Sequence, residues 1–218
     1  MSQTPINFYF VTLHPRIIES YCEVGIFKRA IDEAKVKVHI VYLREYAVDK
    51  HGSIDDKPYG GGPGMIMRPE PLADAVQAIK DNDPDAKVLL LDPKGEVWTQ
   101  KNAEEFNAKP YSCIFVCGRF EGIDQRFIDL YVDKQISVGQ YIVSGGELPA
   151  LTVADSILRM QTLDEPSLHD TFSSQFDNKK EYPQYTRPEI FKGQKVPKIL
   201  LSGNHQKIEE WRGTKKVT

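Results

Sequence analysis

The sequence predicts an α/β protein built around a mostly parallel sheet. Short apolar runs rich in β-branched residues alternate, over residues 8–160, with helix-length amphipathic segments. The apolar runs are nearly continuous, which is typical of parallel strands covered on both faces. A chain of 218 residues is also long enough for a sizeable core, because folding at this size buries roughly 70% of the unfolded surface.

The expected elements follow one another in the order of strand–helix–strand units. Strands are predicted at residues 8–13, 36–43, 88–91 and 111–117. Helices are predicted at residues 15–34, 70–80, 99–107, 124–131 and 147–160.

A polar segment, residues 161–180, interrupts this alternation. It contains Pro166 and several Ser and Asp residues without a convincing period, so we predict a linker with the composition of a mobile segment. Beyond it, residues 196–212 predict a small helical module that starts at a proline. We therefore expect one domain over residues 1–160, a linker over 161–180 and a small C-terminal domain over 181–218.

Composition favours a cytoplasmic globular protein. No stretch approaches the roughly 18 apolar residues of a membrane span, and residues 1–10 lack the basic region of a signal peptide. Cys22, Cys113 and Cys117 have no paired metal spacing. We expect free core thiols in a reducing compartment, and a redox pair or half a zinc site is the alternative.

Charge is distributed unevenly along the chain. The net charge is −3, which taken alone argues against a nucleic-acid partner. Residues 179–218 nevertheless contain 10 Lys and Arg against 4 Asp and Glu, whereas the preceding 178 residues contain 18 against 27. A basic C-terminal segment on an acidic body fits a phosphate-contacting module, and it fits a solvated surface equally well.

Four glycine-bearing loops follow predicted strands or short apolar runs. Ligands of open α/β sheets bind outside the carboxyl ends of the strands, where glycine lets the backbone approach a ligand directly. Glycine also serves ordinary turns, but four such loops together predict a nucleotide-like ligand held by main-chain groups. The loops are residues 92–95, 118–122, 138–140 and 144–147.

The longest glycine segment, residues 60–64, fits no nucleotide-hydrolysis motif. It lacks the Gly-Lys-Ser/Thr ending of a P-loop and follows no clear strand. A plain surface loop is one interpretation. Because ordering three adjacent glycines is entropically costly, a loop that moves or contacts a partner is the other. The sequence also has neither a Gly-x-Ser-x-Gly elbow nor His-rich metal spacing, so acyl transfer and zinc chemistry are not indicated.

Five motifs, in order, resemble the TrmD family, the bacterial tRNA (guanine-37-N1) methyltransferases. They are residues 55–65, 118–124, 138–147, 185–188 and 196–212, and the likeness runs from about Phe8 to Arg212. The resemblance implies a SPOUT-type fold, a mostly parallel sheet domain with a deep trefoil knot, plus a small helical C-terminal domain. It also implies an obligate homodimer with the active site at the interface, S-adenosylmethionine bound in the knot, and the tRNA anticodon stem-loop held by the small domain.

The resemblance also assigns roles to individual residues. Cofactor binding is implied for Leu91, Asp92, Pro93, Gly118, Glu121, Val138, Gly139, Gln140, Tyr141, Ile142, Val143, Gly145 and Gly146. In some members the acid at the position of Glu121 is linked to a magnesium requirement. RNA binding is implied for Asp55, Tyr59, Gly60, Arg187, Lys192, Lys207 and Arg212.

Methylation of guanine N1 requires a base and a cation. N1 carries a proton in neutral guanine, and its removal places negative charge on O6. The resemblance implies Asp170 as the base, within Asp170-Thr171-Phe172, and Arg159 as the cation. The target guanine is expected to be flipped out of its stack.

Two other functions stay open from the sequence. One is a different SPOUT methyltransferase acting on ribosomal RNA or on a ribose 2′-hydroxyl, and the other is a non-catalytic RNA-binding protein that keeps the knot. The segment after the linker is shorter than in most family members, so we also expect weaker tRNA binding.

Overall fold

The computed structural model describes residues 4–162 and 182–215. The chain divides into two compact units, Met1–Leu163 (unit 1) and Asp164–Thr218 (unit 2). A five-stranded sheet in the order β2-β1-β6-β5-β7 organises unit 1, and every pairing in it is parallel. Its strands are β1 (Ile6–Thr12), β2 (Val36–Tyr42), β5 (Lys87–Val97), β6 (Cys113–Cys117) and β7 (Lys134–Ser137). The predicted α/β class with a mostly parallel sheet is confirmed.

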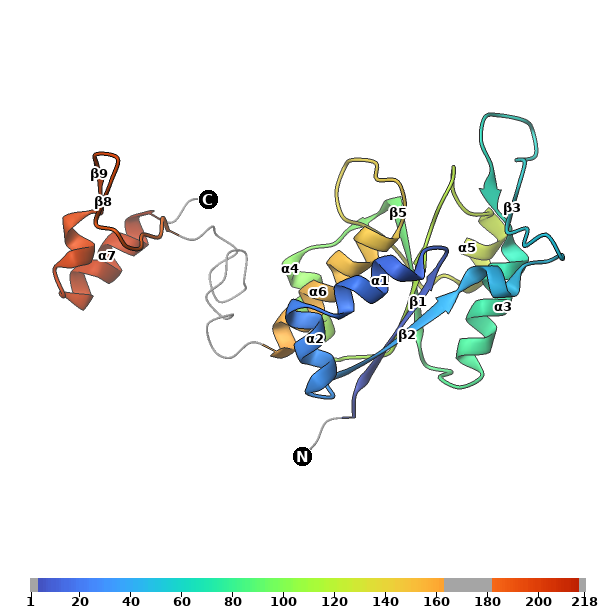
Figure 1. The fold of residues 1–218 in the computed structure, drawn as a ribbon, viewed down its shortest axis with the longest axis horizontal. Coiled ribbons are helices and arrows are strands. Elements are labelled where there is room, and N and C mark those ends of the chain that lie inside the picture. Colours follow the sequence, from blue (N-terminus) through green and yellow to red (C-terminus); the bar gives the residue numbers. More distant parts are fainter. Residues whose placement is uncertain (1–3, 163–181, 216–218) are drawn as a thin grey trace. The chain divides into compact units, whose positions relative to one another are not determined.

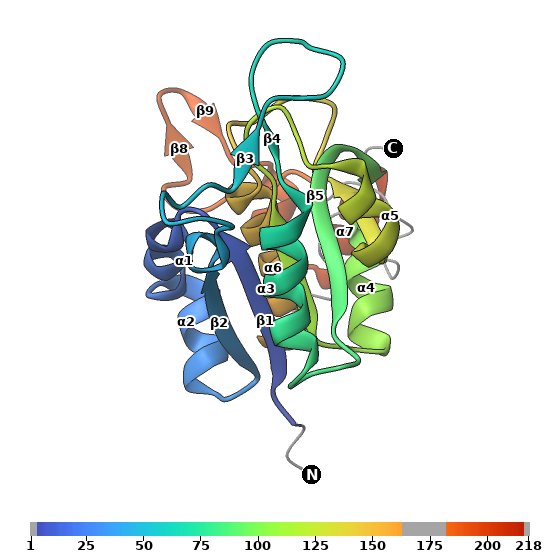
Figure 2. The same cartoon turned by 90° about the vertical axis from the view of Figure 1, so that its right-hand side faces the viewer.

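Helices cover both faces of this sheet (Figures 1 and 2). One face carries α1 (Pro15–Cys22), α2 (Gly25–Asp32), α4 (Gln100–Ala108) and α6 (Glu147–Thr162), and the other carries α3 (Pro69–Lys80) and α5 (Gln125–Tyr131). The sequence of strand β6 is apolar throughout because both of its faces are buried. Cys113, Phe115 and Cys117 enter the core under α6, whereas Ile114 and Val116 enter the core under α3.

The predicted helix over residues 15–34 is two helices, α1 and α2. Val24 has an extended backbone (φ −134°, ψ 162°) and Gly25 has φ +59°. Neither conformation continues a right-handed helix, and a positive φ is available mainly to glycine. The apolar periodicity spans the break because both helices pack on the same face of the sheet.

Strand β5 is longer than predicted and contains a bulge. Ile136 of β7 pairs with Leu91 and again with Glu96, so the intervening residues 92–95 loop out of the ladder. The expected loop at 92–95 is therefore present, but it interrupts a strand rather than ending one. Strand β7 itself is not predictable from the sequence pattern, because it has four residues and only one is aliphatic.

Two short strands flank the glycine segment. β3 (Asp55–Asp56) pairs antiparallel with β4 (Ile66–Met67), so residues 57–65 form a loop closed at its base. The expectation that no strand precedes residues 60–64 is wrong, because a two-residue strand carries no periodic signal. Upstream, the 3₁₀ helix η1 (Leu43–Tyr46) follows β2 and packs on α3.

Unit 2 contains a hairpin, β8 (Ile190–Phe191) with β9 (Gln194–Lys195), then the 3₁₀ helix η4 (Lys198–Leu201) and α7 (His205–Lys215). The helical module predicted at 196–212 corresponds to η4 and α7, whereas the hairpin is an addition to the predicted elements. In unit 1, α6 continues through Thr162, two residues into the predicted linker. In the described part of the chain, no helix combines the length and apolar character needed to cross a membrane.

Candidate functional site

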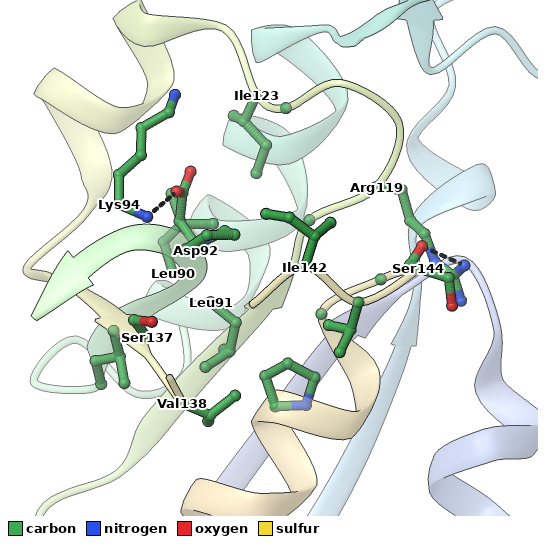
Figure 3. Close-up of a pocket in the computed structure, with 18 of the residues that line it drawn as sticks. Leu90, Leu91, Asp92, Lys94, Arg119, Ile123, Ser137, Val138, Ile142 and Ser144 are labelled. Carbon is green, nitrogen blue, oxygen red and sulfur yellow. Dashed lines mark hydrogen bonds between the residues drawn. The ribbon is translucent and has the colours of Figure 1, made fainter. Parts of the chain in front are cut away.

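The glycine loops predicted from sequence meet in one pocket at the carboxyl edge of the sheet. The β5 bulge, the loop after β6, the loop after β7 and the turn before α6 all line it. Figure 3 shows Leu91, Asp92, Val138 and Ile142 from these segments around the cavity. Its volume is about 420 Å³, which lies in the range of small-molecule sites.

Glycine is required where the segments approach most closely. A Cβ on Gly146 would lie 2.7 Å from both the Cα of Cys117 and the backbone nitrogen of Gly118. These are backbone atoms of a buried strand end, so they have no room to move away. The Gly146 N–H instead donates a hydrogen bond to the Gly118 carbonyl (2.9 Å). This contact holds the start of α6 against the end of β6.

The loop after β7 is held by local hydrogen bonds. The Gly139 N–H donates to the Ser137 hydroxyl oxygen (3.2 Å), and that hydroxyl donates to the Gly139 carbonyl (3.0 Å). Gly139 has φ +152°, and the ring of Tyr141 occupies the space that a Cβ would need. The Tyr141 hydroxyl donates back to the Val138 carbonyl (3.3 Å). These bonds give the loop a defined shape.

The structure brings together every predicted cofactor residue except Gln140, which is exposed and outside the pocket lining. The matching motif is continuous over residues 138–143, and position 140 is the one member of it outside the pocket lining. The sequence argument missed further residues of the wall, although all of them lie in or beside the predicted loops and strand ends. They are Leu90, Arg119, Phe120, Gly122, Ile123, Ile136, Ser137, Ser144 and Pro149.

Glu121 connects the pocket to the glycine segment. Its backbone N–H donates to the Met65 carbonyl (3.0 Å). A Cβ on Gly64, which has φ +77°, would lie 2.8 Å from Oε1 of Glu121.

Within residues 4–162 and 182–215, no three His, Cys, Asp or Glu side chains gather into a metal centre. Glu121 and Asp92 are the acidic side chains that the described structure places on the pocket wall.

Of the two predicted catalytic residues, the structure describes Arg159 and not Asp170. Arg159 lies in the last turn of α6 with an exposed side chain. Asp170 lies outside the described residues.

The predicted RNA-binding residues belong to both units. Asp55 is in β3, and Tyr59 and Gly60 are in the loop between β3 and β4, where the Tyr59 side chain is 99% exposed. In unit 2, Arg187, Lys192 and Lys207 are exposed.

Arg212 is placed differently from the other basic residues of unit 2. Its side chain is only partly exposed. It pairs with Glu209, and its guanidinium lies 4.9 Å from the Tyr182 ring centroid. Arg212 therefore contributes to the internal packing of unit 2.

A parallel α/β sheet with a glycine-lined pocket at its carboxyl edge places this chain among the α/β proteins that bind a ligand outside the ends of their strands. Comparison with known proteins narrows the class. A family model described as tRNA (Guanine-1)-methyltransferase TrmD matches residues 6–218. The chain belongs to this family.

Curated relatives named tRNA (guanine-N(1)-)-methyltransferase match along most of the chain. The protein of Clostridioides difficile (strain 630) is 44% identical over 213 residues, which cover 95% of this chain and 90% of the relative. The Alcanivorax borkumensis protein is 43% identical, with 93% of this chain and 77% of the relative covered. The Geobacillus kaustophilus protein is also 43% identical, with 93% and 83% covered.

Proposed function

We propose that this chain transfers a methyl group from S-adenosylmethionine to N1 of the guanosine at position 37 of tRNA, beside the anticodon. The observation that carries the proposal is the family match over residues 6–218. The relatives that share 41–44% of their residues with this chain bear the name of that activity. The pocket supports it independently, because its walls suit a nucleoside.

The pocket residues fit the methyl donor chemically. Leu91, Val138 and Ile142 offer apolar surface to an adenine ring, and glycine-bearing loops line the same pocket. Backbone N–H and C=O groups of such loops can approach the polar edge of the ring directly. Acidic side chains on the wall, Glu121 and Asp92, suit the positively charged end of the cofactor. When bound, S-adenosylmethionine supplies a sulfonium-linked methyl group that a nitrogen nucleophile can accept. Gln140, although outside the pocket lining, stays a proposed cofactor contact as part of the same loop.

The proposed fold includes the trefoil knot of SPOUT proteins. Its support is the arrangement of residues 138–146, which share one pocket with the β5 bulge and the loop after β6 before the chain enters α6. In this proposal residues 1–160 form the knotted domain, 161–180 connect it, and 181–218 form a small tRNA-binding domain for the anticodon stem-loop.

A homodimer is part of the proposal. Two apolar side chains are largely exposed here: Ile142, on the pocket wall, at 80%, and Leu148, next in sequence to the wall residue Pro149, at 60%. Exposed apolar groups that gather at one place mark interaction surfaces. A second copy of the chain would cover them and complete the active site.

The reaction requires a base and a cation, and by the family resemblance we assign Asp170 as the general base and Arg159 as the stabilising cation. The Asp170 carboxylate accepts the N1 proton, and the N1 electron pair forms the new N–C bond. When bound, S-adenosylmethionine would supply the methyl group and would leave as the neutral thioether. The Arg159 guanidinium stabilises the negative charge that develops on O6. One such positioned charge lowers the activation free energy by roughly 2.7–4 kcal/mol.

A methylation assay with Asp170→Asn tests the proposal. We expect the native chain to form N1-methylguanosine on unmodified tRNA with guanosine at position 37, and not on tRNA with adenosine there. Asp170→Asn should lower the rate by about 10²–10⁴-fold, the usual contribution of a general base. Asp164→Asn, the matched control, should retain activity. An active Asp170→Asn variant would remove the base assignment, and absence of product from the native chain would contradict the reaction.

Glu121 is the residue that we propose as a ligand of Mg²⁺. Mg²⁺ commonly keeps several waters and binds through one or two carboxylates together with its substrate, which fits a wall that has few acids. Methylation should therefore fall when EDTA is added and recover with excess Mg²⁺. Equal rates with and without EDTA would exclude a metal requirement.

A further inference from the structure

Arg119, on the pocket wall, forms an ion pair with Glu147, which lies outside the pocket lining. Nη2 of Arg119 lies 2.9 Å from Oε2 of Glu147, and the Arg119 Nε donates to Oε1 over 3.3 Å. The Glu147 side chain is 2% exposed and that of Arg119 is 17% exposed. Arg119 follows Gly118 at the end of β6, and Glu147 is the first residue of α6.

The pair ties together the ends of three elements. Thr12, at the end of β1, donates from its hydroxyl to Oε1 of Glu147 (2.8 Å). Nη1 of Arg119 donates to the Ser144 carbonyl (3.0 Å), a contact visible in Figure 3. Through these bonds, the loop after β6 and the turn before α6 are cross-linked by side chains as well as by the Gly146–Gly118 backbone bond.

The surroundings leave this pair little freedom. A Cβ on Gly145 would collide with Nε of Arg119 and would lie 2.7 Å from Oε2 of Glu147. Nη2 of Arg119 is the group that the described structure places against Oε2 of Glu147, which accepts no other hydrogen bond there. The glycine turn closes over the pair and fixes both side chains in one arrangement.

Stability alone does not account for a buried pair of this kind. Desolvation of two charges offsets most of their attraction, and apolar side chains of similar volume commonly serve a core equally well. A fixed pair does, however, set the separation of the elements that carry it. Here those elements supply Gly118, Glu121, Gly145 and Gly146 to the pocket wall.

We propose that Arg119 and Glu147 are positioning residues for the cofactor. By holding the loop after β6 at a fixed distance from the turn before α6, they keep the backbone groups of both segments in place before S-adenosylmethionine binds. Preorganisation of this kind increases affinity because less ordering is left to the binding step. The inference rests on the proposed function, since it takes S-adenosylmethionine as the ligand of this pocket.

The proposal predicts an effect on cofactor binding that exceeds any effect on folding. Glu147→Gln keeps the volume and the hydrogen bond to Thr12 but removes the charge. Arg119→Lys keeps the charge but lacks the fork that reaches Glu147 and Ser144 together. Each variant should weaken S-adenosylmethionine binding at least about tenfold, equivalent to about 1.4 kcal/mol. The loss should act mainly on cofactor binding, so the KM for S-adenosylmethionine should rise by a larger factor than kcat falls.

The experiment measures the dissociation constant by calorimetry, the methylation kinetics and Tm for each variant. Val76→Ala is the matched control, because Val76 is fully buried in the core under α3 and does not line the pocket. It should lower Tm without changing the dissociation constant. If one unpaired buried charge prevents folding, the double variant Arg119→Met with Glu147→Gln removes both charges and should show the same loss of affinity.

Two results would overturn the proposal. One is native cofactor affinity in both single variants, or in the double variant, with Tm lowered as in Val76→Ala. The other is a native dissociation constant for S-adenosylmethionine in Arg119→Lys alone, which would show that the positive charge matters and the forked guanidinium does not. A third result separates the two proposals. If the native chain binds S-adenosylmethionine and the variants bind it more weakly, but guanosine 37 is never methylated, the positioning role stands and the proposed reaction fails.

Discussion

At the scale of single residues, the three cysteine thiols differ in depth. Cys113 and Cys117 are fully buried in β6, and Cys22 is partly buried at the end of α1. Burial raises the pKa of the Cys113 and Cys117 thiols well above the usual value, because a thiolate there would lose its hydration. Burial, assisted by the charge of Glu23, raises the pKa of Cys22 to about 11. The expectation of free core thiols is confirmed for Cys113 and Cys117.

These shifts predict slow alkylation of the native protein. The thiolate is the reactive form, and a raised pKa leaves little of it at about pH 8. Iodoacetamide should therefore modify the native chain slowly, at Cys22 first, and the Cys22 rate should rise about tenfold per pH unit below its pKa, as thiolate fraction does. Mass spectrometry of timed samples measures both rates. In Cys22→Ser, labelling should require unfolding, and rapid labelling of that native variant would contradict the assignment.

Residue-level prediction from sequence succeeds where a signal is local. Gly118, Gly139 and Gly146 are predictable because each lies in a glycine loop near a strand or helix end. The Arg119–Glu147 pair is not, since its members are 28 residues apart and neither residue is unusual in its own loop. Only the folded chain shows that the β6 end and the start of α6 are adjacent.

At the scale of elements, the β5 bulge depends on Gly95. A Cβ there would lie 2.5 Å from the backbone nitrogen of Ile136, in the neighbouring strand β7. Backbone atoms in a parallel ladder cannot yield without breaking hydrogen bonds. Gly95→Ala should therefore separate β5 from β7 and lower the free energy of unfolding by about 1–3 kcal/mol, the usual cost of overpacking. Urea unfolding monitored by tryptophan fluorescence measures the change, and unaltered stability would show that the bulge adapts.

The same substitution in α7 should have the opposite sign. Gly213 lies inside this helix, and no atom lies within 4 Å of the position of an added Cβ. Alanine is favoured over glycine inside a helix by about 0.5–1 kcal/mol. Gly213→Ala should therefore stabilise unit 2 by that amount, measured by circular dichroism during thermal unfolding. A loss of stability would indicate that an added methyl group meets an obstacle.

Elements are predictable from sequence in proportion to their length and periodicity. The helix predicted at 70–80 matches α3 within one residue at its start, because its apolar positions repeat over twelve residues. The two-residue strands β3 and β4 and the four-residue β7 are too short for a period to emerge. They are strands because partners elsewhere in the chain pair with them.

At the scale of the molecule, strand order is the part that sequence could not supply. Phe8 of β1 pairs with Cys113 of β6, although more than a hundred residues separate them in the sequence. A near-continuous apolar strand indicates burial on both faces but does not name its neighbours. The class of fold is therefore predictable from composition and alternation, whereas the sheet order required the structure.

The charge difference between the two units governs how the molecule should respond to salt. Unit 2 contains exposed Lys192 and Lys207, and the chain as a whole has a net charge of −3. Contacts between lysines and phosphates release counterions, so affinity falls linearly with salt on logarithmic axes. Removal of one such lysine should reduce that slope by roughly 0.7–0.9. Under the proposed function, tRNA is held largely by lysine–phosphate pairs from unit 2.

Lys192→Ala and Lys207→Ala should each weaken tRNA binding at low salt and flatten the salt dependence by about one phosphate contact. Lys101→Ala is the matched control, since Lys101 is an exposed lysine of α4 that pairs with Glu105 in unit 1. It changes the net charge equally, so an unaltered slope in this variant would show that position and not total charge determines binding. Filter binding over a range of salt concentrations measures all three slopes. If Lys192→Ala and Lys207→Ala both keep the native slope, the phosphates are held elsewhere and unit 2 is not the tRNA-binding surface.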